Sequence, residues 1–367
     1  MTERPTLAVG LMSGTSLDGM DAALVRLTGP TEAHLLGFVH LPYTRDYRGR
    51  LAAAMDEGRT RELALLHAAI AEWAVEATAE LLAQTHTKAT DLDFIAFHGQ
   101  TIWHEPPVVS WQLGEPARLA EAFGVRVVSG FRGRDVAAGG QGAPLVPIAD
   151  VLLFGADHPR VLLNLGGVAN ATWVPRRAVL EGAFAFDSGP GMAVIDEVAR
   201  LVEPGLSFDV DGRLAAAGAP DRAVLAELLA DPFFDAEPPK STGRERFGRG
   251  YSAALFRRVG GANAVATAVE LTAMSVARAI NRWMPQATEV VGSGGGCHHP
   301  GVMAALAGHL GTGIRLARFD DLFFSGDAKE AVAFALLGYL SVHGQPGNLP
   351  AVTGAKGSRV LGMITPA

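Results

Sequence analysis

Residues 7–27 read LAVGLMSGTSLDGMDAALVRL, two apolar runs joined by a turn rich in glycine, serine and aspartate. Short apolar runs bounded by such turn residues are typical of β-strands, which we expect at residues 7–12 and 22–27. A third run, at residues 34–41, follows the next turn. The N-terminal segment therefore predicts a three-stranded meander.

The rest of the chain alternates helical and extended patterns. Apolar residues spaced by three and four predict a long helix around residues 63–81. The further elements that we expect are strand 94–97, helix 116–123, strand 125–128, strands 161–165, 171–174 and 183–186, helix 192–202, helix 262–284, strand 289–291, a helix, strand 314–317 and helix 328–340. An irregular, charged and proline-containing stretch at 231–251 interrupts this series.

Both halves of the chain thus begin with three strands and continue with alternating helices and strands. This repeated order predicts an α/β protein made of a duplicated unit, with two lobes around one cleft. We expect the first lobe at residues 1–140 plus 328–367 and the second at residues 141–327. The inference rests on element order, because no residue-level repeat is visible.

Composition excludes several classes of protein. The 367 residues are 49% hydrophobic and 19% charged, unlike a disordered or fibrous chain. The 31 Lys and Arg against 38 Asp and Glu give a net charge of −7 without a basic run, so we expect no nucleic-acid partner. The start, MTERPTLAVG, lacks a signal-peptide core and no apolar stretch is long enough to span a bilayer. We therefore expect a soluble, cytoplasmic protein without membrane attachment.

The turn GLMSGTSLDGMD at residues 10–21 is the densest signal for chemistry. Small residues between two strands can bring several backbone N–H groups and hydroxyls to one concave point, which suits phosphate oxygens. Asp18 or Asp21 could also hold a hydrated Mg²⁺. The alternative is an ordinary tight hairpin turn, in which the same residue types are common.

Asp187 lies in a second motif, FAFDSGPG at residues 184–191. An acid at the carboxyl end of a strand in an open α/β sheet lies where such folds usually bind ligands. Asp187 is therefore the candidate general base. A helix N-cap or a turn aspartate is the alternative role.

Two glycine-rich stretches follow strands of the second half. NLGGVAN at 164–170 corresponds in position to the first turn, so a duplicated fold would aim two glycine turns at one phosphate chain. GSGGG at 292–296 would let a flat base or a ribose lie close to the backbone. Either stretch alone is also common as a plain turn.

Several histidine and amide side chains could bind a ligand or serve only the structure. HGQT at 98–101 and WQLG at 111–114 offer groups that hydrogen-bond a polar ligand, or only the loop backbone. Cys297 is the single cysteine, so no intrachain disulfide is possible. Cys297, His298 and His299 are adjacent and no second cluster has zinc-site spacing, so no zinc site is expected. A P-loop, G-x-G-x-x-G and G-x-S-x-G are absent from the sequence.

Taken together, these motifs closely resemble one family, the anhydro-N-acetylmuramic acid kinases of peptidoglycan recycling. The matching strings span nearly the whole chain in the family's order: GLMSGTSLDGMD (10–21), HGQTIWH (98–104), WQLGEP (111–116), FRGRDVAAGGQGAPLVP (131–147), NLGGVAN (164–170), FDSGPG (186–191), KSTGRERF (240–247), GGGCHHP (294–300) and NLPAVTGA (348–355).

The resemblance implies the duplicated ribonuclease H-like, actin-like ATPase fold of the sugar kinase superfamily, with an interlobe cleft. It implies an ATP- and Mg²⁺-dependent kinase that hydrolyses the anhydro ring of 1,6-anhydro-N-acetylmuramic acid and phosphorylates O6. The products are N-acetylmuramic acid 6-phosphate and ADP. The resemblance, with the base rate for symmetric enzymes, also predicts a homodimer.

By resemblance, Asp187 is the catalytic base and activates water for attack at C1. The expected nucleotide-binding residues are Gly14, Thr15, Ser16, Leu17, Asp18, Gly19, Met20, Asp21, Gly166, Gly167, Gly294, Gly295 and Gly296. Asp18 is the expected Mg²⁺ ligand. For the sugar we expect His98, Gln112, Arg132 and Glu330, with Arg132 on the lactyl carboxylate.

Some of these roles have alternatives. Arg132 could form a surface ion pair with Asp135, and Glu330 could complement the dipole of the last helix. The chain has Met192 and His299 where we expect asparagine in the family, which puts in doubt one polar contact near the base and one near the adenosine.

Two other functions remain open. A plain sugar or acid kinase of the same superfamily would use its base to deprotonate a hydroxyl. A nucleotide-gated sugar sensor without turnover would usually carry a helix-turn-helix and a basic face, and the sequence shows neither.

Overall fold

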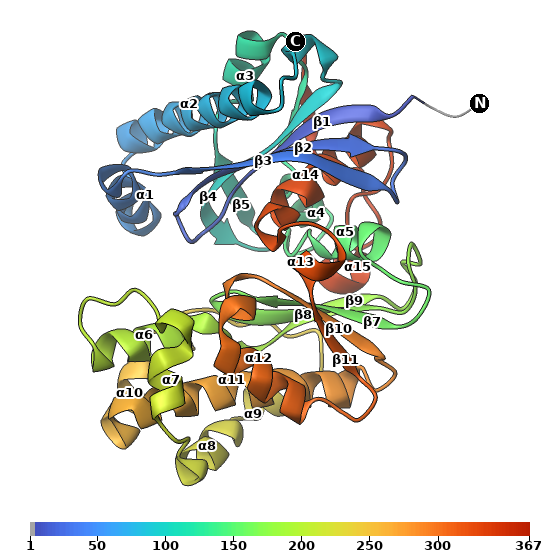
Figure 1. Cartoon of the computed structure of the whole chain (residues 1–367). Helices are drawn as coiled ribbons and strands as arrows, with labels where there is room; N and C mark the ends of the chain where they lie inside the picture. Colours follow the sequence, from blue (N-terminus) through green and yellow to red (C-terminus); the bar gives the residue numbers. More distant parts are fainter. Residues whose placement is uncertain (1–3) are drawn as a thin grey trace. The chain divides into compact units, whose positions relative to one another are not determined.

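Two mixed β-sheets organise the protein (Figure 1). The computed structural model describes residues 4–367, and the chain divides into two compact units, each built around one sheet. The first unit comprises the chain up to Leu153 together with Ala328–Ala367, and the second comprises Phe154–Asp327. Each unit contains part of the candidate site residues.

The sheet of the first unit has the order β3-β2-β1-β4-β6, with β12 beyond β6 and β5 paired with β4. Its strands are β1 (Thr6–Ser13), β2 (Gly19–Leu27), β3 (Ala33–Pro42), β4 (Phe94–Glu105), β5 (Val109–Leu113), β6 (Val127–Ser129) and β12 (Met363–Thr365). The first three strands are antiparallel neighbours, whereas β1, β4 and β6 run parallel. The predicted N-terminal meander is confirmed.

Helices cover the sheet of the first unit on both faces. They are α1 (Arg45–Glu57), α2 (Thr60–Gln84), α3 (Pro116–Phe123), α4 (Gly133–Ala137), α5 (Pro147–Leu153), α14 (Lys329–Val342) and α15 (Pro350–Thr353), with the 3₁₀ turn η1 (Ala89–Asp91). Val9 and Leu11 of β1 lie in one buried cluster with Leu66 of α2. Gly10, on the other face, meets α14, since a Cβ there would lie 1.9 Å from the carbonyl oxygen of Ala331. Only glycine allows this close packing.

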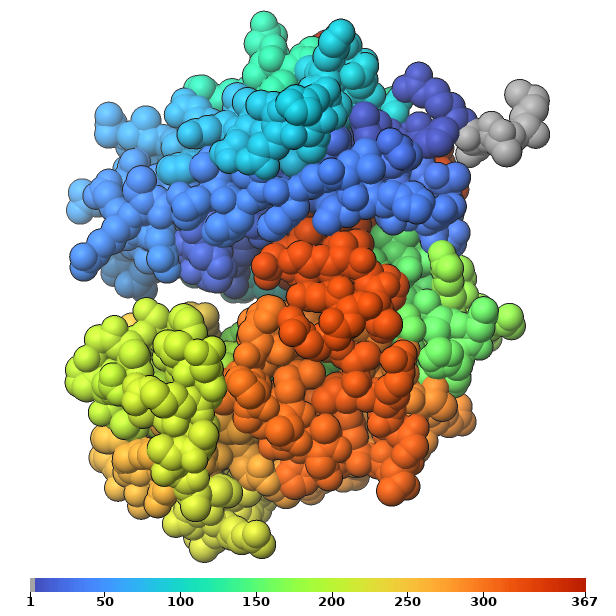
Figure 2. All heavy atoms as spheres, viewed as in Figure 1, coloured from blue at the N-terminus to red at the C-terminus, as the bar shows by residue number. Residues whose placement is uncertain are grey.

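The C-terminal part of the chain thereby returns to the first unit. Helix α14 packs against β1, β2 and β4. Figure 2 shows orange-red residues from this part of the chain lying against the blue N-terminal residues. Helix α14 therefore begins beside β1, as the packing of Ala331 against Gly10 requires.

The sheet of the second unit has the order β9-β8-β7-β10-β11. Its strands are β7 (Arg160–Leu165), β8 (Val168–Val174), β9 (Phe184–Pro190), β10 (Glu289–Ser293) and β11 (Arg315–Arg318). Again the first three strands are antiparallel and the first, fourth and fifth are parallel. Both units therefore share the order 3-2-1-4-5 of the ribonuclease H-like fold, and the predicted duplication of an α/β unit is confirmed.

The second unit carries most of its helices after β9. They are α6 (Met192–Val202), α7 (Arg213–Ala217), α8 (Arg222–Leu229), α9 (Pro232–Asp235), α10 (Arg249–Val259), α11 (Gly261–Trp283), α12 (Pro300–His309) and α13 (Phe319–Leu322), with the 3₁₀ turns η2 (Val210–Gly212), η3 (Gly295–His298) and, at the division between the units, η4 (Gly326–Ala328). Helix α11 is buried along most of its length and contacts β9, α6 and α12.

The two divisions of the chain compare differently with the expected boundaries. The second falls between Asp327 and Ala328, where the sequence also set it. The first falls after Leu153 rather than after residue 140, because α5 packs on α14 and Asp150 forms a 2.7 Å ion pair with Lys329. No helix among residues 4–367 combines the length and apolar character that crossing a membrane requires.

Candidate active site

The turn between β1 and β2 is fixed from several sides in the first unit. Ser13 Oγ lies 2.6 Å from Gln100 Oε1 and 3.0 Å from the carbonyl oxygen of Gly19. Tyr43 OH donates a 2.8 Å hydrogen bond to the same Oγ. Gln100 Nε2 in turn donates to the carbonyl oxygen of Gly14. The sequence analysis considered Gln100 as a contact to a polar ligand and did not name Tyr43, whereas the structure shows that both side chains hold this turn in shape.

The tip of this turn faces solvent. Thr15 and Ser16 are exposed, whereas Leu17 is buried and adopts a left-handed backbone with φ of 57°. Asp18 is exposed and accepts a 2.7 Å hydrogen bond from Ser16 Oγ. Hydroxyls and backbone N–H groups grouped in such a turn are suited to phosphate oxygens.

The carboxylates near this turn fit Mg²⁺ in its usual mode. Mg²⁺ generally takes one or two protein carboxylates and fills its other positions with water and phosphate oxygens. Asp18 offers an exposed carboxylate, whereas Asp21 is 2.7 Å from Nδ1 of His40. Among residues 4–367, no three His, Cys, Asp or Glu side chains group so that they could hold a metal ion. The donor set therefore suits an ion held largely by a nucleotide.

A buried His98 and a partly buried Arg132 form a pair in the first unit. Arg132 Nε donates a 3.0 Å hydrogen bond to His98 Nε2, so the ring proton lies on Nδ1, which donates to the carbonyl oxygen of Gly99 at 2.7 Å. Burial and the charge of Arg132 hold the pKa of His98 well below its usual value. His98 is therefore neutral, and both of its ring nitrogens are engaged within the protein.

Arg132 keeps part of its guanidinium available. Its Nη1 donates to the carbonyl oxygen of Gly142 at 2.8 Å, and no protein group among residues 4–367 pairs with Nη2. Burial lowers the pKa of Arg132 to about 10, against the opposing charges of Glu330 and Asp135, so it stays charged at neutral pH. Desolvation and the charge of Asp21 raise the pKa of Glu330. The charges of Arg132 and Glu330 thus influence each other's pKa, although no ion pair between them is found among residues 4–367.

Asp135 has a different role from the surface ion pair considered for Arg132. Its side chain is completely buried, and its oxygens accept hydrogen bonds from Gly142 N at 2.8 Å, Asn348 Nδ2 at 2.7 Å and Thr353 Oγ1 at 2.8 Å. The two family strings at 131–147 and 348–355 are therefore joined to each other through one carboxylate.

Gln112 belongs to a polar row on the hairpin of β4 and β5. Its Nε2 donates to Ser110 Oγ at 2.9 Å and to Thr101 Oγ1 at 3.2 Å, and His104 Nδ1 lies 3.0 Å from Ser110 Oγ. Burial and the charge of Arg132 lower the pKa of His104. The sequence analysis did not group Thr101, Ser110 and His104 with Gln112, because only the strand pairing reveals that they share one face.

Asp187 lies in the middle of β9 in the second unit, because the strand continues to Pro190 and does not end before Asp187 as the sequence predicted. Burial raises its pKa from 3.8 to about 6, although the hydrogen bond from Thr242 N to its Oδ2, at 2.9 Å, acts in the opposite direction. The negative charge of Glu245 adds to the increase. A carboxylate with this pKa is ionised at neutral pH and is basic enough to take a proton from an attacking water.

Two asparagines share the level of Asp187 in the sheet. Asn164 of β7 pairs with Asn170 of β8, which in turn pairs with Asp187 of β9. Paired residues of neighbouring strands project from the same face, so the three polar side chains form a row across the sheet. The string at 164–170 contains both asparagines, but the sequence assigned a role only to its glycines.

The turn of Gly166 and Gly167 is held against the start of α6. Gly166 O accepts from Met192 N at 2.7 Å, and Gly167 O accepts from the amides of Gly191 and Ala193. Within the described part of the chain, no group accepts a hydrogen bond from the amide N–H of Gly166 or Gly167. A Cβ on Gly191 would lie 2.2 Å from Gly166 O, so glycine is required there.

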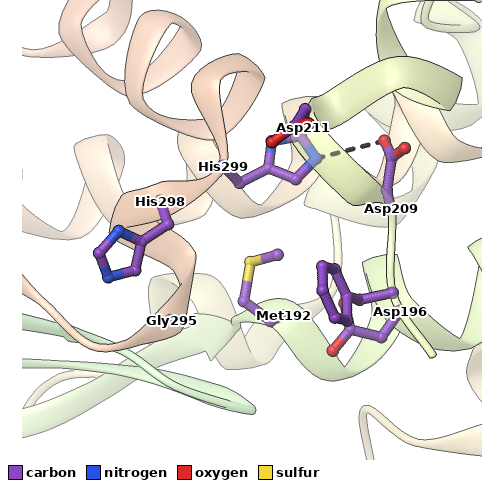
Figure 3. A pocket seen from close by; sticks show the side chains of 8 residues that line it. Met192, Asp196, Asp209, Asp211, Gly295, His298 and His299 are labelled. Atoms are coloured by element: carbon purple, nitrogen blue, oxygen red, sulfur yellow. Dashed lines mark hydrogen bonds and ion pairs between the residues drawn. The ribbon is translucent and has the colours of Figure 1, made fainter. Parts of the chain in front are cut away.

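A cavity of about 370 Å³ lies in the second unit beside the third glycine stretch (Figure 3). Its volume falls within the usual range for small-molecule sites. Met192, Asp196, Phe208, Asp209, Asp211, Gly295, His298 and His299 line it. Gly295 is thus in the wall of the cavity, with Gly294 and Gly296 next to it in the chain. Asp196, which the sequence analysis missed, has a buried Oδ1 without a hydrogen-bond partner, and burial raises its pKa to about 6.

The two departures from the family pattern both contribute to this cavity. His299 Nδ1 accepts from Val302 N at 3.2 Å and so caps α12, as an asparagine side chain would. Its Nε2 points to Asp209 Oδ2 at 3.3 Å (Figure 3). The Sδ of Met192 lies close to Gly296 and forms an apolar part of the wall.

Comparison with known proteins identifies the family. The family described as anhydro-N-acetylmuramic acid kinase matches residues 6–367. A protein of that name from Gloeobacter violaceus is 43% identical over 99% of this chain and 99% of its own. Another of that name, from Caldanaerobacter subterraneus, is 39% identical over 98% of this chain and 96% of its own.

A comparison of structures gives weaker similarity. Component A of the (R)-2-hydroxyglutaryl-CoA dehydratase of Acidaminococcus fermentans matches with a TM-score of 0.46 and 13% identity, over 90% of this chain and 96% of that chain. Similarity at that level carries no functional information. The full-length sequence matches are decisive, and the chain belongs to the anhydro-N-acetylmuramic acid kinase family.

Proposed function

We propose that the protein is an ATP-dependent kinase that hydrolyses 1,6-anhydro-N-acetylmuramic acid and phosphorylates its O6 in one event. The products are N-acetylmuramic acid 6-phosphate and ADP, as expected for recycling of peptidoglycan. Membership of the family supports the substrate. The observation that carries the chemistry is the partly buried carboxyl of Asp187, with its pKa of about 6.

One carboxylate is sufficient for this reaction. Ordinary glycoside cleavage needs a base or nucleophile and also an acid that protonates the leaving oxygen. Here Asp187 takes a proton from water as the water oxygen attacks C1, and the bond between C1 and O6 breaks. The electron pair of O6 then forms a bond to the γ-phosphorus, and the bond from that phosphorus to the bridging oxygen of ADP breaks. The phosphoryl group thus replaces the proton donor.

Two turns are proposed to contact phosphates of ATP. The one in the first unit is the turn at residues 14–21, whose exposed tip includes Thr15 and Ser16. The one in the second unit is the turn of Gly166 and Gly167, with its available amides. Asp18 would hold Mg²⁺ there, and the ion would neutralise phosphate charge when bound.

The cavity of the second unit is proposed to bind the adenosine. Met192 and Phe208 offer apolar contact for a flat base, and Gly295 lets the nucleoside approach the backbone. The unpartnered Oδ1 of Asp196 suits a donor group on the nucleoside.

The sugar is proposed to contact Arg132, Gln112 and Glu330 of the first unit. The available edge of the Arg132 guanidinium would meet the lactyl carboxylate, because planar, two-pronged contact is the preferred geometry for this pair. His98 was expected to touch the sugar, but its engaged ring nitrogens support a positioning role for Arg132 instead. A cytoplasmic location and a homodimer complete the proposal.

The test is to identify the product formed from the anhydro sugar, ATP and Mg²⁺ by mass spectrometry. The proposal requires a product that has gained both phosphate and the elements of water, and almost none with Asp187→Asn. Asp157→Asn, at an exposed acid of the same unit, is the matched control and should act as the wild type. A phosphorylated product without added water would identify a plain kinase. If both ligands raise the melting temperature without ADP release, the protein is a sensor.

A further inference from the structure

The family string KSTGRERF at residues 240–247 has no role in the reaction as described so far. Both of its ends are anchored in the second unit. Lys240 Nζ donates to the carbonyl oxygens of Phe233 and Phe234 at 2.9 and 3.2 Å and lies over the Phe233 ring. Phe247 is completely buried among aromatic side chains. The residues between these anchors are therefore held in a defined place.

The segment passes directly beside the proposed base. Asp187 N donates to the carbonyl oxygen of Lys240 at 3.1 Å, and Thr242 N donates to Asp187 Oδ2 at 2.9 Å. Thr242 Oγ1 is buried, and no hydrogen-bond partner for it is found among residues 4–367. Buried hydroxyls are usually paired, so an unpaired one beside a reactive carboxylate indicates a missing ligand or water.

Arg244 follows at once and extends to the second glycine turn. A Cβ built on Gly167 would lie 3.5 Å from Arg244 Nη2 and 3.6 Å from its Nε. Arg244 is exposed, and within residues 4–367 it takes part in no hydrogen bond or ion pair. Its neighbour Arg246 instead pairs with Asp231 at 2.5 Å and lies over two phenylalanine rings.

Among residues 4–367, no carboxylate forms an ion pair with Arg244 at this turn. The amides of Gly166 and Gly167 have no acceptor, and the carbonyl oxygens of both residues are used by the start of α6. The charge of Arg244 acts to lower the pKa of Asp196 of α6. The buried Oδ1 of Asp196, however, has no hydrogen-bond partner among residues 4–367. Two available amides and an unpaired guanidinium at one turn form a place for an anion rather than for a protein carboxylate.

We propose that Arg244 contacts a phosphate of the bound nucleotide and stabilises the negative charge of the transferred phosphoryl group. This inference rests on the proposed function and adds a catalytic residue to it. Phosphoryl transfer depends mainly on positioning and charge neutralisation, and an arginine is well suited to both. Arg244 stays protonated throughout and donates no proton. The bonds that break and form are those already described at C1, O6 and the γ-phosphorus.

The test compares Arg244→Ala and Arg244→Lys with the control Arg249→Gln. Arg249 is exposed and lies 3.9 Å from Glu197, so its variant removes a positive charge from the same part of the unit without touching the turn. Removal of a catalytic arginine from a phosphoryl-transfer site typically lowers kcat by about 10³-fold or more, and we expect that for Arg244→Ala. Arg244→Lys should retain part of the activity, because it keeps the charge but not the planar fork.

Two further readouts separate a phosphate contact from a structural effect. Calorimetry should show that Arg244→Ala raises the dissociation constant of ATP by about tenfold or more. The dissociation constant of adenosine should stay unchanged, because only the phosphates contact the guanidinium. Added guanidinium ion should restore part of the kcat of Arg244→Ala and none in the control. Arg244 is exposed, so its variants should keep the wild-type melting temperature.

The inference is overturned if Arg244→Ala binds ATP and turns over within about twofold of the wild type, well inside the loss typical of an arginine contact. The inference is equally overturned if Arg244→Ala weakens the binding of ATP and the binding of adenosine by the same factor. Failure of the proposed function would look different, because the wild-type protein itself would then leave the anhydro sugar unchanged. In that case the comparison of ATP with adenosine still decides whether Arg244 binds phosphate.

Discussion

Arg132 Nε donates a 3.0 Å hydrogen bond to Nε2 of a neutral, buried His98. Together with the bond from Nη1 to the carbonyl oxygen of Gly142, this contact fixes the plane of the guanidinium and leaves Nη2 for a ligand. A charged group fixed in this way loses less conformational entropy when it binds a carboxylate. We therefore propose that His98 affects sugar binding through Arg132.

We expect Arg132→Ala to raise KM for the anhydro sugar by about 10- to 100-fold, which corresponds to loss of a hydrogen-bonded charge pair. The effect on kcat should be smaller, because the lactyl group does not react. His98→Ala should raise KM in the same direction but less, since it loosens the guanidinium without removing it. Steady-state kinetics with purified variants measures both.

The control for this prediction is a substrate that lacks the lactyl group, 1,6-anhydro-N-acetylglucosamine. KM for this sugar should be nearly the same for the wild type, Arg132→Ala and His98→Ala. If both variants raise KM equally for the two sugars, Arg132 does not recognise the lactyl carboxylate.

The pH dependence of kcat should follow the ionisation of Asp187. Its pKa of about 6 means that the base is protonated below that pH, so log kcat should fall by one for each pH unit below about 6. The acid limb should be absent from the residual activity of Asp187→Asn. Asp196 also has a pKa of about 6, so Asp196→Asn is the matched control and should retain the limb.

The same pKa makes a prediction about stability. Because burial raises the pKa of Asp187 in the folded state, its ionisation opposes folding above pH 6, and this penalty disappears below about pH 4. Asp187→Asn should therefore increase the free energy of unfolding at pH 8 by about 3 kcal/mol. Urea unfolding at pH 8 and pH 4 measures this, and a variant that is less stable than the wild type at pH 8 would contradict it.

Asp135 should be one of the most sensitive positions for stability in the first unit. Its buried oxygens accept three hydrogen bonds, two of them from Asn348 and Thr353 near the end of the chain. Asp135→Asn would turn an amide toward a donor and should lower the free energy of unfolding by about 2–4 kcal/mol. Thr353→Val, which removes one bond, should cost about 1 kcal/mol. Equal stability of Asp135→Asn and the wild type would show that the carboxylate does not join these segments.

Glu289 should contribute stability but not activity. It pairs in register with Arg160 and Arg315 at the amino end of the parallel strands, away from the turns that follow β7 and β10. Burial raises its pKa, but the hydrogen bond and charge of Arg160 outweigh this, so the net pKa is lowered. The stabilisation is thus present above the unfolded pKa and is lost as pH falls through the folded pKa.

Glu289→Gln should therefore lower the free energy of unfolding at pH 7 by about 3–5 kcal/mol, and the difference from the wild type should shrink below pH 4. The folded variant should keep the wild-type kcat. A large loss of kcat with unchanged stability would contradict the claim that Glu289, at the amino end of the strands, contributes to stability and not to activity.

The sequence predicted the strands and long helices well because their signals are local. The helices at 116–123 and 192–202 were predicted with their observed bounds, since apolar periodicity and flanking glycines mark both. Strand β5 was missed because it forms a hairpin with β4 in which the apolar side chains of Trp103 and Trp111 are exposed. These exposed tryptophans obscure the alternation of buried apolar and exposed polar residues that marks a strand. Strand β12 has three residues and forms only by pairing with β6.

Within the proposed site, the sequence singled out the glycine turns and Asp187 but not the residues that contact them. Gln100, Thr242 and Asp196 act through contacts to residues 55 to 87 positions away or through a cavity wall, which no local pattern shows. The role of His98 depends on which nitrogen faces Arg132, and only the folded structure decides this. The division of the chain after Leu153 likewise depends on the packing of α5.

The most direct test of coupled hydrolysis and phosphorylation is the reaction of 1,6-anhydro-N-acetylmuramic acid with ATP and Mg²⁺ in ¹⁸O-labelled water. Mass spectrometry should find one ¹⁸O at C1 and none in the phosphate, and Asp187→Asn should form almost no product. The product alone, kept in the same water for the same time, corrects for exchange at C1. Phosphorylated sugar without ¹⁸O at C1, or with ¹⁸O in its phosphate, would contradict the attack of an Asp187-activated water on carbon.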